Sequence, residues 1–139
     1  MVEPLVLQPR LEAAMLARRH VRRVLQQWAL VDLIDPVMLL TSEVVTNALL
    51  HSGTTMTVRL ARAGAGVRVS VEDGSTVVPV RRRHSTTAST GRGVQLLASI
   101  ATDWGSKPLD DGKVVWFTVL DDRGWTTTLD LDALAEADL

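Results

Sequence analysis

Cysteine is absent from this 139-residue sequence, so neither a disulfide framework nor a thiolate zinc site can form. No uninterrupted apolar run approaches the roughly 20 residues that a membrane-spanning helix needs. The N-terminus lacks a basic segment followed by an apolar one, so we expect no signal peptide and a cytoplasmic location. A net charge of -1 and a pI of about 6.3 give no overall positive charge for direct nucleic-acid binding.

The sequence contains enough apolar residues to form the core of one compact domain. Apolar residues make up 46% of the chain, which is typical of a folded protein and argues against disorder. A chain of this length can bury a substantial core, so we predict a single domain spanning residues 1–139.

Periodicity predicts an alternation of helices and antiparallel strands. We expect an extended segment at 2–8, helices at 9–30, 36–52 and 91–100, a long loop at 74–90, a hairpin of strands 54–62 and 67–71, further strands at 113–120 and 125–129, and a short C-terminal helix within 130–139. Runs of helices and runs of strands favour an α+β fold, here a two-layer sandwich with helices on one face of a mixed sheet.

The helix predicted at 36–52 is the most informative stretch. Pro36 suits its first turn, and Asp35 is predicted to cap it. Glu43, Asn47 and His51 recur every four residues and therefore share one side of the helix, whereas most of the remaining circumference is apolar. Buried polar groups need partners. Two interpretations remain open: a core helix whose polar stripe reaches solvent or nearby backbone, or a ligand site.

Two further segments carry polar groups that suit a ligand. Asp73 ends a predicted strand in the segment VEDGS, where it is either a solvated turn residue or an acceptor for an exocyclic amine. Gly91 and Gly93, in the segment TGRGV, allow backbone N–H groups to approach an anion at the start of a helix. That pair alone matches neither a P-loop nor a dinucleotide fingerprint, and by itself it indicates a helix start.

Twelve of the fifteen basic residues lie within residues 1–92. Arg81, Arg82 and Arg83 lie in the predicted loop, where they either contact a phosphate or are simply solvated. The predicted helix 9–30 also has an arginine-rich face, which is either a solvated surface or a partner surface. If the protein forms a homodimer, we expect this helix to take part.

Taken in order, these segments resemble the GHKL superfamily of ATPases and kinases, which includes gyrases, heat-shock chaperones and histidine kinases. The segments SEVVTNALLHS, GRGVQLL and GKVVWF resemble those of anti-sigma factor serine/threonine kinases, and most of all those of short actinobacterial ATP-binding regulatory proteins. The resemblance covers residues 39–117 and implies the Bergerat ATP-binding fold, with ATP and Mg²⁺ as cofactors.

The resemblance also implies roles for individual residues. Asn47 would be the Mg²⁺ ligand, Glu43 the general base, and Asp73 the acceptor for the adenine amino group. His51 would lie near the phosphates or support the metal. The implied ATP-binding set is Asn47, His51, Asp73, Ser75, Gly91, Arg92, Gly93 and Val94.

The sequence departs from the superfamily pattern at two places. Ser75 and Val77 replace the two later glycines of the D-x-G-x-G motif. Lys113 and Val114 stand where many relatives place a threonine in a Gly-Thr strand motif, so a hydroxyl near the base is missing.

The predicted function is a Mg²⁺-ATP-dependent serine/threonine protein kinase that regulates transcription. It would phosphorylate an anti-anti-sigma-like antagonist and sequester a sigma factor or a similar partner. The alternative is a non-catalytic, ATP-responsive protein-binding module. A third interpretation is a structural α+β domain that binds no nucleotide.

Overall fold

In the computed structural model, residues 2–75 and 100–120 are described. Their elements are β1 (Leu5–Leu7), α1 (Ala13–Gln27), the 3₁₀ helix η1 (Val31–Leu33), α2 (Ile34–His51), β2 (Met56–Ala63), β3 (Gly66–Asp73), β4 (Asp103–Leu109) and β5 (Gly112–Leu120). Residues 91–99 of the predicted helix 91–100, the strand at 125–129, the C-terminal helix and nearly all of the loop 74–90 lie outside the described residues.

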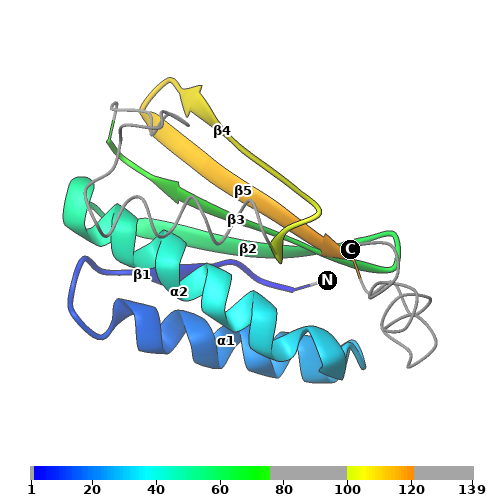
Figure 1. Cartoon of the computed structure of the whole chain (residues 1–139). Helices are drawn as coiled ribbons and strands as arrows, with labels where there is room; N and C mark the ends of the chain where they lie inside the picture. Colours follow the sequence, from blue (N-terminus) through cyan, green and yellow to red (C-terminus); the bar gives the residue numbers. More distant parts are fainter. Residues whose placement is uncertain (1, 76–99, 121–139) are drawn as a thin grey trace.

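The strands form one sheet in the order β1-β2-β3-β5-β4, with both helices on one face (Figure 1). This confirms the predicted two-layer α+β arrangement. All four pairings among the described strands are antiparallel, so the expected mixed sheet is not found in this part of the chain. The predicted hairpin is confirmed and its strands extend further, to residues 56–63 and 66–73.

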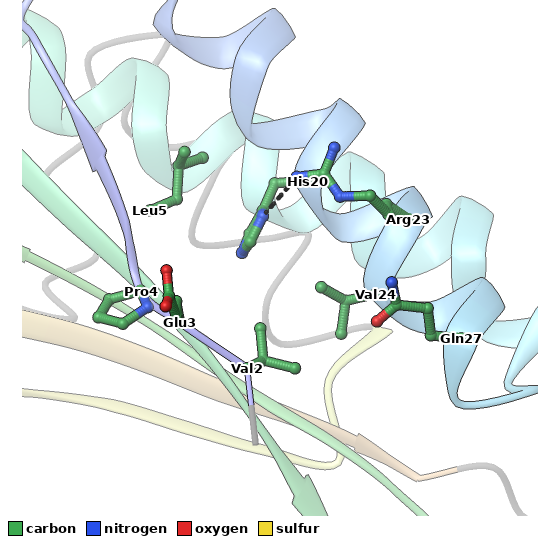
Figure 2. Close-up of a pocket in the computed structure, with 8 residues that line it drawn as sticks. All are labelled: Val2, Glu3, Pro4, Leu5, His20, Arg23, Val24 and Gln27. Carbon is green, nitrogen blue, oxygen red and sulfur yellow. Dashed lines mark hydrogen bonds between the residues drawn. The ribbon is translucent and has the colours of Figure 1, made fainter.

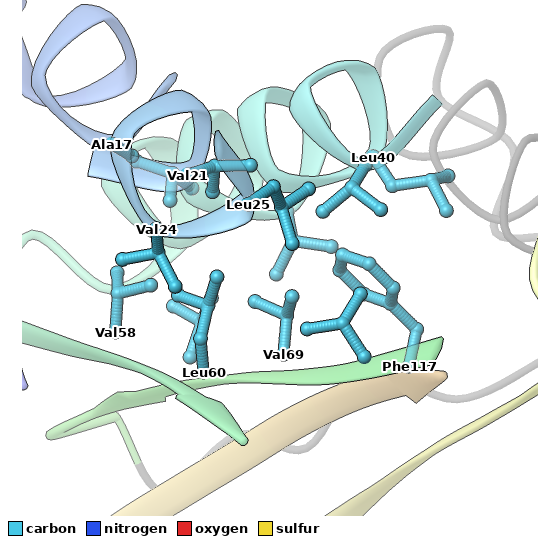
Figure 3. Close-up of a cluster of buried hydrophobic side chains, with 14 of the residues drawn as sticks. Ala17, Val21, Val24, Leu25, Leu40, Val58, Leu60, Val69 and Phe117 are labelled. Atoms are coloured by element: carbon cyan, nitrogen blue, oxygen red, sulfur yellow. The ribbon is translucent and has the colours of Figure 1, made fainter. Parts of the chain in front are cut away.

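The core lies between the helices and the sheet. α1 contacts β1 and β2, whereas α2 contacts β3 and packs along α1. Figure 3 shows the side chains that meet there: Ala17, Val21, Val24 and Leu25 from α1, Leu40 from α2, and Val58, Leu60, Val69 and Phe117 from the strands. Apolar burial of this kind is the main force that holds the two layers together.

The apolar character of α2 is explained by this packing. By length and mean hydropathy (1.4), residues 31–51 are long and apolar enough to cross a membrane, but 44% of the most apolar window is buried inside the fold. Val37, Leu40 and Val45 are fully buried. The predicted cap at Asp35 is wrong. Because the helix begins two residues earlier, at Ile34, Leu33 is the N-cap residue and it makes no side-chain cap hydrogen bond.

Strand β4 was not predicted. Its sequence, DWGSKPL, contains a glycine and a proline and lacks regular alternation. The proline is tolerated because β4 is an edge strand of the sheet formed by residues 2–75 and 100–120, and proline at an edge costs the sheet little. Gly105 suits this strand because a Cβ there would lie only 3.0 Å from the ring of Trp116 on β5.

Candidate nucleotide site at the end of α2 and β3

The predicted polar stripe follows one side of α2. Glu43 and Asn47 are half-buried and His51, in the last turn, is exposed. Their neighbours Val44 and Ala48 are buried against the core. The stripe therefore runs along the boundary between the helix face that packs on the sheet and the face that does not.

Asn47 is the residue of this stripe whose side chain best suits a bound ligand. Its side-chain Oδ1 is buried and accepts no hydrogen bond from the described part of the chain. Leaving a buried acceptor unsatisfied costs about 1–3 kcal/mol. An amide oxygen is a ligand that Mg²⁺ accepts, and Mg²⁺ typically takes only one or two protein oxygens, completing its shell with water and substrate phosphates. Asn47 therefore fits the metal-ligand role that the sequence resemblance implies.

Hydrogen bonds tie the end of α2 to the end of β3. Ser52, the C-cap residue of α2, lies with its Oγ 2.6 Å from the Oγ1 of Thr54. The backbone N–H of Gly74, directly after β3, donates to the same Thr54 Oγ1 at 2.8 Å. The last turn of α2 and the residues that follow Asp73 therefore lie at the same end of the molecule, at the left in Figure 1.

Asp73 is the most strongly held group at this end. Lys113 lies opposite it in the β3–β5 register and donates from Nζ to Oδ1 (3.1 Å) and Oδ2 (2.9 Å). The backbone N–H of Ser75 also donates to Oδ1, at 2.8 Å. The Lys113 and Asp73 side chains are only 5% and 2% exposed. Asp73 is therefore a buried, ion-paired carboxylate and not a solvated turn residue.

Close backbone packing fixes this pair. A Cβ on Gly112 would lie 1.9 Å from the backbone oxygen of Asp73, so only glycine fits there. Lys113, which follows it, is held directly across from Asp73. Once β3 and β5 are known to be neighbours, the acid that ends one strand and the lysine that begins the other become an expected pair. From the sequence alone, Lys113 is only a departure from a motif, because the strand order is not known.

Only part of the predicted site lies within the described residues. The structure places Glu43, Asn47 and His51 on one helix and Ser75 beside Asp73. The other predicted ATP-binding residues, Gly91, Arg92, Gly93 and Val94, lie outside the described residues, as does the loop arginine cluster. The phosphate-binding half of the site stays a prediction.

A separate hollow of about 380 Å³ lies between the N-terminal segment and α1. Its lining residues, shown in Figure 2, are Val2, Glu3, Pro4, Leu5, His20, Arg23, Val24 and Gln27. None of them belongs to the predicted nucleotide site. His20 is 6% exposed as a whole residue, its Nδ1 lies 3.2 Å from the Arg23 guanidinium, and its Nε2 has no partner among the described residues. Burial, followed by the Arg23 charge, lowers the pKa of His20 below 6.5.

The fold has counterparts among solved structures. No family model matches the chain, and no curated protein matches it. Among solved structures, it is similar to the histidine kinase domain of a blue-light activated histidine kinase from Erythrobacter litoralis EL346. That match has 25% sequence identity and a TM-score of 0.47, and covers 64% of this chain. The chain spans 45% of that structure, less than half of its length.

Proposed function

We propose that this protein binds Mg²⁺-ATP in the manner of GHKL kinases. The observation that carries the proposal is the buried Oδ1 of Asn47, which has no hydrogen-bond partner within residues 2–75 and 100–120. Its position one turn after Glu43, on a helix whose C-terminal end is hydrogen-bonded to the end of β3, supports the same conclusion. Mg²⁺ would supply positive charge to the phosphates, and Asn47 would hold it through its amide oxygen.

The finer proposal is a serine/threonine protein kinase of the anti-sigma type. Glu43, a half-buried carboxylate, would accept the proton of a serine or threonine hydroxyl while that oxygen bonds to the γ-phosphorus and ADP leaves. The proposed acceptor is an anti-anti-sigma-like protein, and the proposed sequestered partner is a sigma factor in the cytoplasm. The anti-sigma type of kinase is supported by the resemblance of the segments SEVVTNALLHS, GRGVQLL and GKVVWF.

The metal role of Asn47 is tested by thermal unfolding with and without Mg²⁺-ATP. A ligand at about 100 times its Kd stabilises the folded state by roughly 2.7 kcal/mol, which is a shift of several degrees for a domain of this size. We expect Asn47→Ala to lose this shift. Thr46→Ala, one residue earlier on the same helix and also half-buried, is the matched control and should retain it. An equal shift in Asn47→Ala would contradict the metal role.

The kinase proposal is separated from the non-catalytic alternative by Glu43→Gln. The amide keeps the size of the side chain but cannot accept the proton, so phosphotransfer should fall by a factor of about 10²–10⁴ while ATP binding is retained. The measurement is transfer of labelled γ-phosphate to a candidate acceptor protein. Unchanged transfer would remove Glu43 from the chemistry, whereas ATP-dependent partner binding without any transfer would favour the non-catalytic module.

A further inference from the structure

The Asp73 carboxylate is occupied by the protein itself. A carboxylate offers about four acceptor positions. Lys113 Nζ donates a hydrogen bond to each carboxylate oxygen, and the Ser75 backbone N–H donates a further one to Oδ1. With only 2% of its side chain exposed, Asp73 presents almost no surface to an incoming molecule. A ligand that needs this carboxylate must first loosen the contact with Lys113.

The group that holds Asp73 has the same hydrogen-bonding chemistry as the ligand expected there. An exocyclic amine of a purine and the ammonium of a lysine are both nitrogen donors that seek an oxygen acceptor, and the ammonium adds a full charge. The lysine head is carried on a flexible stem of four carbons, so it can leave Asp73 while the backbone of β5 stays paired with β3. Displacement of Lys113 therefore requires no change in the sheet.

We propose that Lys113 is an intramolecular competitor for the base-recognition carboxylate, and that it sets the affinity of the protein for adenine nucleosides and nucleotides. This inference rests on the proposed function, because it takes adenine as the base that reaches Asp73. An adenine ligand binds by exchanging its amine for the Lys113 ammonium, and the nucleotide-free protein is held with the base site closed.

The test uses calorimetric titration with adenosine, which probes the base site without phosphates or metal. Lys113→Thr removes the competing ammonium, and we expect it to tighten adenosine binding by at least about tenfold, since a hydrogen bond to a charged group no longer has to be exchanged. The matched control is Lys107→Thr. Lys107 is the only other lysine of the chain and lies exposed on the neighbouring strand β4. Weaker or unchanged binding in Lys113→Thr would overturn the proposal.

A second measurement needs no substitution at the buried pair. With only two lysines, amine-specific labelling followed by peptide mass spectrometry reports each of them separately. In the nucleotide-free protein, Lys107 should react quickly and Lys113 slowly, because Lys113 is buried. Adding adenosine should raise the reactivity of Lys113 and leave that of Lys107 unchanged. If bound adenosine leaves Lys113 protected, the proposal is wrong.

The two proposals fail in different ways. Tighter adenosine binding in Lys113→Thr supports the competitor role whatever Asn47→Ala does to Mg²⁺-ATP binding. Mg²⁺-ATP binding that depends on Asn47, together with no effect of Lys113→Thr on adenosine, would overturn the competitor role and leave the proposed function standing. Absence of binding of either ligand to any variant would overturn both.

Discussion

At the scale of single residues, the most informative features are buried polar atoms that lack a hydrogen-bond partner among the described residues. Asn47 Oδ1, Thr41 Oγ1 and His20 Nε2 are each buried without a hydrogen-bond partner among the described residues. Most buried polar groups in native proteins are paired. Asn47 belongs to the polar stripe of α2, for which a ligand site was one of the two interpretations left open by the sequence and the one implied by the family resemblance. His20 lies elsewhere, on α1, and its burial has a consequence for pH dependence.

We predict that His20 makes the protein less stable in mild acid. Its pKa is lower when folded than when unfolded, so below about pH 6.5 the unfolded chain binds the extra proton first. Its contribution is therefore fully present above the unfolded pKa and is lost as the pH falls toward the folded pKa. Urea denaturation at pH 7.5 and pH 5.0, for wild type and His20→Gln, measures this.

The variant is the control for other titrating groups. Carboxylates contribute to the pH dependence of both proteins, so the difference between the two proteins isolates His20. If the free energy of unfolding falls by the same amount between pH 7.5 and pH 5.0 in wild type and in His20→Gln, then His20 does not contribute to the pH dependence of stability.

At the scale of elements, the end of α1 shows how an ordinary residue occupies a special backbone position. Leu30 N–H donates to Leu25 O at 2.8 Å and Ala29 N–H donates to Gln26 O at 3.1 Å. This is the hydrogen-bond pattern of a Schellman motif, and its two apolar ends, Leu25 and Leu30, are both buried. Ala29 has a φ of 58°, the left-handed region where glycine is usual.

We predict that Ala29→Gly stabilises the protein. Replacing an alanine in the left-handed region by glycine removes backbone strain and raises the free energy of unfolding by about 1 kcal/mol or somewhat more. The greater conformational freedom of glycine in the unfolded chain offsets part of this increase, so the net increase is about 0.5 kcal/mol. Chemical denaturation detects such a gain as a higher midpoint with an unchanged slope. Ala14→Gly, in the first turn of α1, is the control and should give no gain in stability, because alanine is not in the left-handed region there. A lower midpoint for Ala29→Gly would contradict the strain assigned to Ala29.

At the scale of the whole molecule, the sheet is held most firmly at its centre. β3 is paired on both sides, with β2 and β5, whereas β1 and β4 are edges. β1 has only three residues, and the Asp103–Leu109 edge is mostly exposed or half-buried. Local opening is easiest where few apolar contacts hold a strand.

Native-state hydrogen exchange should therefore show a gradient across the sheet. We expect the slowest amides in β3 and β5, around Val69 and Phe117, both fully buried, and faster exchange in β1 and β4. Amide exchange read by NMR provides the measurement without any substitution. Equal protection in β4 and β3 would mean that the sheet opens only as a unit.

The sequence predicted local structure better than long-range contacts. The hairpin, the two helices and the last described strand have strong periodicity, and all were confirmed. β4 was missed because Gly105 and Pro108 interrupt it, and only its pairing with β5 makes it a strand. The Asp73–Lys113 pair was missed because it joins residues 40 positions apart, and their contact depends on strand order.

The place of β5 in the sheet also bears on how the chain folds. β2 and β3 are joined by a tight turn and pair as a hairpin, whereas the strand that pairs with the second edge of β3 in the described sheet is β5, residues 112–120. Until that late segment arrives, Val67, Val69 and Val71 lie along an unpaired strand edge, which is the kind of surface that joins to other chains. Closing such a distant contact is slow. The chain is therefore most prone to aggregate during the interval between hairpin formation and the docking of β5.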